Sequence, residues 1–548
     1  MKKQSVILFA SMILSIVVFG QDKGILSGNF QSNYSVFIKD SLIGATEAAS
    51  PQYGRQISSA EAWLFMNYDY KGFHVGVRYD LFNNSNLLNP SGAYTGQGLG
   101  FWQIKKSIKD LELTVGSFYD QFGSGMLFRA FENRLIGIDY AMEGVRAKYK
   151  ISDNFTVKAF TGKQKGFQDN RFGTSPQIIK GINTEKGFTS ENGTSLNIGA
   201  SAINRTLDEN TMTGLVTEIN SMPLEDRFYP KYNVYGMNGY FTLNWKDFGV
   251  NGEYNYKSKE AIRDNDGNLF FSNGSILFGG VSYSKRKLGK NKKGGLGINA
   301  QYRRIENFPL TVSPYVSLLN GIVTYQPSFT RQASYRMLAR YQAPAQALGE
   351  QAYQAEIVYS PTKKTSFQVN YSDIKTLEGK QLYSERYGKI EQKLSKKWKG
   401  KIGLQSVIYN QPVYEGKDEK YGNVETITPF FEITYKVDRK NSIRFETQYL
   451  ITEQDLGSFY HGILEWNSSP HFTLALSDMI NTNPVRKVNP TLADQVLHYP
   501  TVFVKYNIKT TSFTAAYVKQ VEGVNCTGGI CRLEPAFSGL RFTLSTQF

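Results

Sequence analysis

Two cysteines have the type and spacing to do chemistry. Cys526 and Cys531 are the only cysteines in the chain, and Thr-Gly-Gly-Ile separates them. Two thiols this close should pair in an oxidising compartment, and the glycines allow the chain between them to turn tightly. A metal site is the weaker alternative, because no His or further Cys lies nearby to complete four ligands. We therefore expect a disulfide that staples the tip of a loop, and no metal.

The histidines do not form a local catalytic motif. There are four of them, His74, His461, His471 and His498. None stands in an HExxH or paired Cys/His spacing, and no GxSxG occurs. A triad assembled from distant residues stays open as an alternative, because a triad need not be local in sequence. Asp264 opens a calcium-like pattern, but Ser275 stands where the late bidentate Glu belongs, so a hairpin turn is favoured. The sequence predicts neither an enzyme nor a cofactor.

Two charged segments have the composition of a pore lining. Segment 116–134 combines three glycines with charged residues, and segment 306–351 is long for a loop and too apolar for disorder. Rings of opposite charge set the field in a pore. The candidate constriction residues are Arg129, Glu132 and Arg134 in the first segment and Arg331, Arg336 and Arg340 in the second. The alternatives are a strand-to-loop junction with solvated charges for the first segment and a docking surface for the second.

Alternation of apolar and polar residues is the main signal of secondary structure. A clear run is Phe431, Ile433, Tyr435 and Val437, which alternate with Glu432, Thr434, Lys436 and Asp438. This pattern predicts strands with one apolar face and one charged face, and a watery lumen tolerates such charges where a sandwich core does not. Beyond the N-terminal segment there is no run of about 18 apolar residues, so helices could not carry the chain across a membrane. A closed barrel is the other structure that satisfies every backbone group in lipid.

The connections between these strands alternate between tight polar turns and longer loops. This rhythm predicts an all-β fold, a closed antiparallel transmembrane β-barrel with short periplasmic turns and long extracellular loops. The tally is about 22 strands, within a range of about 18 to 24. It treats 163–233 and 306–351 as long loop insertions and leaves the run 196–203 out of the wall. We expect one barrel domain over residues 21–548.

The start of the chain and its bulk charge indicate an exported protein. Lys2 and Lys3 precede an apolar run from Val6 to Phe19, so residues 1–20 are predicted to be a signal peptide. The formal net charge is +16, and export makes nucleic acid a poor partner. The basic excess indicates solvated turn charges near lipid headgroups or a lumen that attracts anions. The 35 tyrosines are natural for interfacial girdles.

The final residues carry a resemblance to a known class. Phe542, Leu544 and Phe548 share one parity of an alternating stretch that begins at Leu540. This ending resembles the C-terminal assembly signal of Gram-negative outer-membrane β-barrels, and the Gly20-Gln21 cleavage point with Tyr- and Asn-rich strands is similar to barrels of the Bacteroidota. The resemblance implies a location in the outer membrane, with outer-membrane lipid and the barrel-assembly machinery as partners.

Two functions fit such a barrel. The first is a porin-like channel, narrowed by 163–233 and 306–351, with a basic lumen that favours anionic solutes. The second is a non-catalytic structural subunit whose external loops dock a surface lipoprotein or a secretion partner. An active transporter is less favoured, because strand-like alternation starts at about Gly24 and leaves no room for an N-terminal plug.

Overall fold

The computed structural model describes residues 24–167, 170–289, 292–316, 319–483, 496–527 and 530–548. The predicted signal peptide lies outside these described residues. Two α-helices occur among them, α2 (Glu209–Ser221) and α3 (Gln411–Glu415). Within the described ranges, no helix has both the length and the apolar character that crossing a membrane requires.

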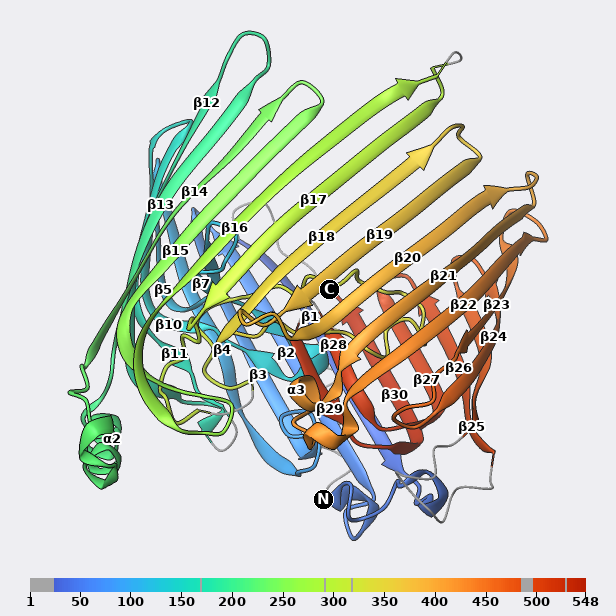
Figure 1. The fold of residues 1–548 in the computed structure, drawn as a ribbon, viewed down its shortest axis with the longest axis horizontal. Coiled ribbons are helices and arrows are strands. Elements are labelled where there is room, and N and C mark those ends of the chain that lie inside the picture. Colours follow the sequence, from blue (N-terminus) through green and yellow to red (C-terminus); the bar gives the residue numbers. More distant parts are fainter. Residues whose placement is uncertain (1–23, 168–169, 290–291, 317–318, 484–495, 528–529) are drawn as a thin grey trace.

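A single antiparallel sheet of 24 strands closes on itself to form a barrel (Figure 1). The strands of its first half are β1 (Ile25–Phe37), β2 (Ser58–Tyr70), β3 (Phe73–Ser85), β4 (Tyr94–Ile108), β5 (Leu111–Phe118), β10 (Met142–Ser152), β11 (Phe155–Lys165), β12 (Thr174–Thr189), β13 (Ser195–Thr206), β14 (Asn233–Trp245), β15 (Phe248–Arg263) and β16 (Leu269–Leu288). The strands of its second half are β17 (Gly294–Glu306), β18 (Gly349–Ser360), β19 (Thr365–Lys375), β20 (Gln381–Lys393), β21 (Trp398–Asn410), β22 (Asn423–Lys436), β23 (Asn441–Leu450), β24 (Ser458–Ser468), β25 (Phe472–Asn483), β26 (Leu497–Ile508), β27 (Thr511–Gln520) and β30 (Phe537–Gln547).

The barrel closes between β1 and β30. Their register runs from Asn29 opposite Gln547 to Phe37 opposite Gly539, and β1 pairs with β2 on its other side. No strand of the described wall is therefore left with an unpaired edge, which is how a barrel satisfies its backbone polar groups without water. The predicted class, an all-β closed antiparallel barrel, is confirmed.

The strand count of about 22 was too low, and the error lies in 163–233. This stretch is not one loop insertion, because β12 and β13 are wall strands that pair with each other. Their register runs from Ile178 opposite Thr206 to Thr189 opposite Ser195. The run 196–203 belongs to β13. A tight turn at 190–194 joins the two strands, so they add one hairpin to the wall. The second expected insertion, within 306–351, does lack wall strands between β17 and β18.

Tight turns gather at one end of the barrel and long connections at the other (Figure 1). Lys71 and Gly72 form a tight turn with φ of 45° and 77°, which matches the primed turns that two-residue hairpins favour. The remaining elements all lie in the long connections: β6 (Asp120–Phe122), β7 (Phe128–Ala130), β8 (Glu132–Asn133), β9 (Ile138–Asp139), β28 (Gly523–Thr527), β29 (Ile530–Glu534), η1 (Ser41–Ile43), η2 (Pro51–Tyr53), η3 (Arg134–Ile136), η5 (Leu224–Asp226), η6 (Glu419–Tyr421), α2 and α3.

The wall has an apolar outside and a polar inside. Along β24, Leu464 faces outward with half of its surface exposed, and Glu465 faces inward toward Arg444. Aromatic pairs stand on the outside next to the tight turns, with ring centroids 6.1 Å apart for Trp245 and Phe248 and 4.4 Å apart for Trp398 and Tyr435. This is the arrangement of a girdle at a membrane interface, where rings sit at the level of lipid headgroups.

Substitutions at two adjacent residues of β25 can distinguish the outer face of the wall from the lumenal face. Leu476 faces outward and is exposed, whereas Ser477 faces inward opposite Thr501. In lipid, Leu476→Arg should destabilise the folded barrel by roughly 2–4 kcal/mol, because the charge enters hydrocarbon. Ser477→Arg should cost much less, since its side chain reaches water. Denaturant titration of refolding into liposomes measures both, and equal costs for the two variants would contradict the assignment of faces.

Candidate functional site

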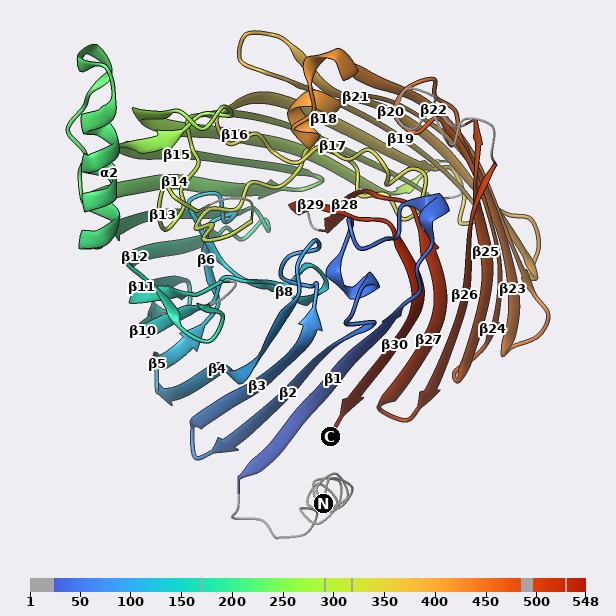
Figure 2. The same ribbon diagram turned by 90° about the horizontal axis from the view of Figure 1, so that it is seen from below.

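The lumen contains segments that fold inward from the long-loop end of the barrel. Figure 2 looks along the barrel and shows them inside the ring of strands. We call them together the lumenal plug, and it consists of the described residues of 38–57, 119–141, 307–348 and 521–536. Most of the buried apolar residues belong to the plug or to the wall strands that it covers. The buried apolar core of the protein therefore lies between the plug and the wall.

The first half of segment 307–348 packs beside segment 119–141. The Arg129 amide donates to the Val323 carbonyl at 3.0 Å, and the Tyr325 amide donates to the Gly125 carbonyl at 3.0 Å. The wall contributes Lys257 on β15, whose Nζ donates to the Pro309 carbonyl at 3.0 Å. This half of the segment is thus fixed on the side of the barrel that contains β11 to β15.

The second half of segment 307–348 contacts strands on another part of the wall. The Tyr335 hydroxyl donates to Glu432 on β22 at 3.0 Å, and the Met337 amide donates to Gln448 on β23 at 2.8 Å. Further along, the Tyr341 hydroxyl donates to Asp455 at 2.8 Å in the connection between β23 and β24. The segment therefore crosses the lumen and is held at both sides.

Glycines on the lumenal face make room for the plug. A Cβ atom at position 181 on β12 would lie 2.5 Å from the ring of Phe160 on β11 and 2.8 Å from the ring of Phe122, and one at position 236 on β14 would lie 2.7 Å from Leu127. These distances are shorter than real Cβ contacts, so a larger residue at either position would force the neighbouring side chains of plug and wall to move. Wall and plug are matched in shape as well as in charge.

A buried charge network joins segment 119–141 to the wall. Arg78 on β3 donates to Asp80 at 2.7 Å, to Glu132 at 2.6 Å and to Asp139 at 2.8 Å. Lys165 on β11 donates to the same Asp139 oxygen at 2.8 Å. Arg78, Asp80 and Asp139 are nearly inaccessible to solvent. Removing one partner of such a buried pair leaves an uncompensated charge and typically costs about 3–5 kcal/mol, so this network anchors the plug.

Asp139 is the centre of the network. Burial by itself would raise the pKa of this carboxyl, but the positive charges of Lys165, Arg171 and Arg78 outweigh burial and hold the pKa well below its usual range. The Tyr119 hydroxyl also donates to Asp139 at 2.9 Å. Asp139 is thus charged at any physiological pH, and its role is to bind the arginines and the lysine rather than to exchange a proton.

The predicted constriction residues all lie in the plug but do not form one ring. Arg129 stacks on Tyr325, with its guanidinium carbon 4.0 Å from the ring centroid. Arg134 pairs with Glu132 at 3.0 Å. In the other segment, Arg331 pairs with Glu385 at 3.4 Å and Arg340 with Asp455 at 3.3 Å. Arg336 is exposed and forms no ion pair within the described residues. A constriction formed by these residues stays a prediction.

Apart from Glu132, the residues of the charge network were missed because they are far apart in sequence. Arg78, Asp80, Asp139 and Lys165 come from three separate stretches of the chain, and no spacing rule joins them. A signal existed for two of them, since Arg78 and Asp80 stand on the polar parity of an alternating strand. That parity predicts that they face the lumen but not what they meet there.

The two cysteines lie in the β28–β29 hairpin. Its register places Cys526 directly opposite Cys531. The hairpin is attached to the plug, because Arg532 donates from Nη1 to the Ile136 carbonyl at 3.0 Å. Facing positions in a hairpin are compatible with the expected disulfide, and the disulfide itself stays a prediction.

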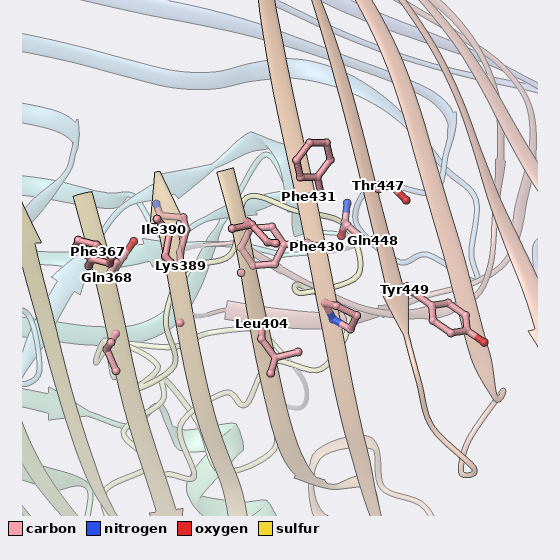
Figure 3. Close-up of a pocket in the computed structure, with 15 residues that line it drawn as sticks. Phe367, Gln368, Lys389, Ile390, Leu404, Phe430, Phe431, Thr447, Gln448 and Tyr449 are labelled. Atoms are coloured by element: carbon pink, nitrogen blue, oxygen red, sulfur yellow. The ribbon is translucent and has the colours of Figure 1, made fainter. Parts of the chain in front are cut away.

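An apolar hollow of about 680 Å³ lies on the wall over strands β19 to β23 (Figure 3). Its outward-facing lining includes Val369, Ile390 and Leu404, and Gly388 contributes no side chain to it. No carboxylate and no histidine line it. In the described part of the chain, no group of three or more His, Cys, Asp or Glu residues is placed to hold a metal ion.

Comparison with protein families gives one match, which covers residues 1–548 and is described as a family of unknown function, DUF6029. The chain belongs to this family. No curated protein matches it. The family thus covers the whole barrel, plug included.

Solved structures of several large barrels are similar to this chain at low sequence identity. The usher PapC in an E. coli P pilus tip assembly intermediate is 10% identical, with a TM-score of 0.43, over 97% of this chain and 62% of that chain. The siderophore receptor PirA from Pseudomonas aeruginosa is 9% identical, with a TM-score of 0.42, over 97% of this chain and 81% of that chain. OccAB3 from Acinetobacter baumannii is 10% identical, with a TM-score of 0.36, over 95% and 99%. This chain spans less than two thirds of the length of the usher chain.

The disulfide can be tested by labelling thiols in the unfolded protein. Without reductant, neither Cys526 nor Cys531 should react with an alkylating reagent, and both should react after reduction. Mass spectrometry of the peptide that contains both residues distinguishes the two states. Full labelling without reductant would show that the thiols are free.

The lowered pKa of Asp455 predicts that the attachment of segment 307–348 to the wall depends on pH. Burial by itself would raise the pKa of Asp455. The charges of Arg340 and Lys417 and hydrogen bonds from Gln411 and Tyr341 outweigh burial and lower the pKa to about 2. Because the folded pKa is below the unfolded value, the stabilisation is complete above about pH 4 and is lost as the pH falls toward 2. This stabilisation of the folded state amounts to about 2 kcal/mol. The hydrogen-exchange protection of residues 335–341, measured relative to the intrinsic exchange rate at each pH, should fall over this range.

Asp455→Asn supplies the control for this pH dependence. At residues 335–341 the variant should be less protected at neutral pH and should show no further loss of protection below pH 4. An acid transition of the same size in both proteins would assign it to another group.

Proposed function

We propose that this protein is a porin-like channel of the Gram-negative outer membrane that passes small anionic solutes through a lumen narrowed by its own plug. The observation that carries the proposal is the closed wall with opposite faces, apolar outside and charged inside. Such a wall places water and polar side chains along a path through lipid. The tight turns would then face the periplasm and the long connections the exterior.

Charges on the lumenal face support the preference for anions. Lys148, Lys389 and Lys505 face inward on β10, β20 and β26, as their cross-strand partners show, and none forms an ion pair within the described residues. Several inward carboxylates, Glu391, Glu432 and Glu465, are paired with cations, whereas Glu253 and Glu356 accept hydrogen bonds from the amides of Asn238 and Gln368. Unpaired positive charge in a confined lumen raises the local concentration of anions.

The plug makes this channel narrow rather than wide. Segment 307–348 starts and ends at neighbouring points of the wall, because the Asn307 amide donates to the Leu348 carbonyl at 2.8 Å and the Phe308 amide donates to the Ala347 carbonyl at 2.8 Å. It can therefore be removed and the gap closed by a short linker without changing β17 or β18. Outer-membrane lipid and the barrel-assembly machinery are the partners that this proposal requires.

A structural subunit is the second candidate function. The observation in its favour is the connection between β13 and β14, where Leu224 and Tyr229 are 78% and 85% exposed beside α2. Large exposed apolar residues at the long-loop end would suit the docking of a surface lipoprotein or a secretion partner. In that case the buried ion pairs of the plug would serve to seal the barrel permanently.

Excision of segment 307–348 separates the two functions. In planar bilayers, the intact barrel should show small anion-selective conductance, and a variant with 309–346 replaced by a short Gly/Ser linker should show a several-fold larger one. A variant with only residues 264–268 replaced should conduct like the parent, because this connection does not belong to the plug. Absence of conductance in both the intact and the excised barrel would favour the structural subunit.

A further inference from the structure

One glycine opens the apolar hollow on the outer wall. Gly388 on β20 faces outward between Val369 on β19 and Leu404 on β21, whose side chains are 56% and 49% exposed. A Cβ atom at position 388 would meet nothing within 4 Å. The glycine therefore leaves a gap between its neighbours, and this gap belongs to the hollow of about 680 Å³ (Figure 3). The volume lies within the range of about 300–1,000 Å³ that is usual for ligand sites.

The lining of the hollow suits hydrocarbon. The next row of the sheet towards the tight turns consists of Phe367, Ile390 and Ile402, which stand opposite one another on β19, β20 and β21 and all face outward. Lys389 also borders the hollow, but its side chain belongs to the lumenal parity of β20. Because the outer face of a barrel is in contact with lipid, acyl chains are the apolar groups available to fill such a hollow.

An arginine stands at the end of the hollow that is nearer to the long-loop end. Arg386 is two residues from Gly388 on the same face of β20, which places their Cα atoms roughly 7 Å apart. Tyr387, between them, is buried and faces the lumen, whereas Arg386 is exposed. The cross-strand partners of Arg386 are Tyr371 on β19 and Ser406 on β21, which are both uncharged. A single cation thus stands on the outer wall directly beside the hollow.

The guanidinium of Arg386 forms no ion pair with any residue that the structure describes. Asp373 lies one row nearer to the long-loop end on the same face, but it accepts a hydrogen bond from Gln381 at 3.0 Å and pairs with Lys375 at 3.6 Å. Glu425 also faces outward, two strands away on β22. The hydrogen-bond donors of Arg386 therefore remain available, and donors at the edge of hydrocarbon need an acceptor.

The position of Arg386 fits the level of lipid headgroups. Towards the tight turns, the outward residues that follow it on β20 are Gly388 and Ile390, which are apolar. Towards the long-loop end, the next outward row contains Ser384 and Asp373, which are polar. Arg386 thus stands at the edge of the apolar band. An outward cation is costly at the middle of a bilayer but costs little at its edge, where phosphate groups are the acceptors.

We propose that the hollow and Arg386 together form a binding site for one anionic phospholipid on the outer wall, with an acyl chain in the hollow and the headgroup phosphate on the guanidinium. The planar fork of arginine donates two parallel hydrogen bonds to a phosphate, so it is well suited to this task. The site requires a barrel in lipid but not a barrel that conducts, and it therefore goes beyond the proposed channel.

Native mass spectrometry of the purified full-length barrel tests the site, because it resolves the mass of each bound lipid. The probes are dioleoylphosphatidylglycerol, dioleoylglycerol, which has the same chains without the phosphate, and glycerol phosphate, which lacks the chains. The parent should bind dioleoylphosphatidylglycerol at least tenfold more tightly than either of the other two. Arg386→Gln should remove the preference for dioleoylphosphatidylglycerol over dioleoylglycerol.

Gly388→Leu fills the hollow and should weaken the binding of both lipids at least fivefold. The barrel should still fold, because the new side chain enters open space. The matched control is Gly239→Leu on β14, since position 239 stands opposite the outward Tyr254, a Cβ there also meets nothing within 4 Å, and the hollow does not include it. Arg304→Gln is the control for charge, because Arg304 faces outward on β17 and pairs with Glu306 at 3.1 Å. Both controls should bind like the parent.

The heat-modified mobility of each variant on gels reports whether the barrel is folded. Unchanged binding of dioleoylphosphatidylglycerol in folded Arg386→Gln or in folded Gly388→Leu would overturn the site. Two further results would do the same. Binding of glycerol phosphate as tight as that of the lipid would assign Arg386 to a soluble anion, and dimers that dissociate in Gly388→Leu would assign the hollow to a second copy of this chain.

Discussion

The hydrogen-bonded seam between β1 and β30 is the constraint on which the rest of the structure depends. It joins the two ends of a single sheet, so that each described strand of the wall pairs with a neighbour on both sides. Lipid offers no replacement for such a partner, and closure is therefore a requirement rather than a preference. Once the wall is closed, residues on alternate parities are assigned to lipid or to the lumen. The aromatic girdle, the charged interior and the inward folding of the long connections all follow from this division.

Inside the wall, the long connections are ordered by contacts with the lumenal face of the strands. Apolar contacts do part of this work, through Phe122 and Leu127 seated on lumenal glycines. Charge does the remainder, because wall arginines and lysines such as Arg78 and Lys165 reach carboxylates and carbonyls of the inward segments. Each anchor joins a rigid strand to an irregular segment. The plug is therefore fixed to the wall at several points, although it contains little secondary structure of its own.

The sequence predicted the class of fold well and the site poorly, and the reasons are physical. Alternation along strands such as 431–437 is a local property with a period of two, and it survives in a single sequence. The hairpin of β12 and β13 was missed because a stretch with few tight-turn signals was read as one loop, although it alternates like its neighbours. Segments 116–134 and 306–351 were singled out by their glycines and arginines, and both contribute to the plug, but their role as a constriction stays a prediction. That they meet each other, and that Asp139 binds Arg78 and Lys165, depends on contacts between distant parts of the chain, which no local pattern encodes.

The ion pairs between wall and plug have a consequence for how this protein tolerates change. Asp139 and Arg78 are almost inaccessible to solvent, and Lys165 is buried beside them. In place of the water that surrounds these charges in an unfolded chain, each has a protein partner of opposite sign. A substitution in the wall at this point is therefore also felt by the loop, because it leaves a charge that water does not reach. Wall and loop are in this respect one unit, and neither can vary independently of the other.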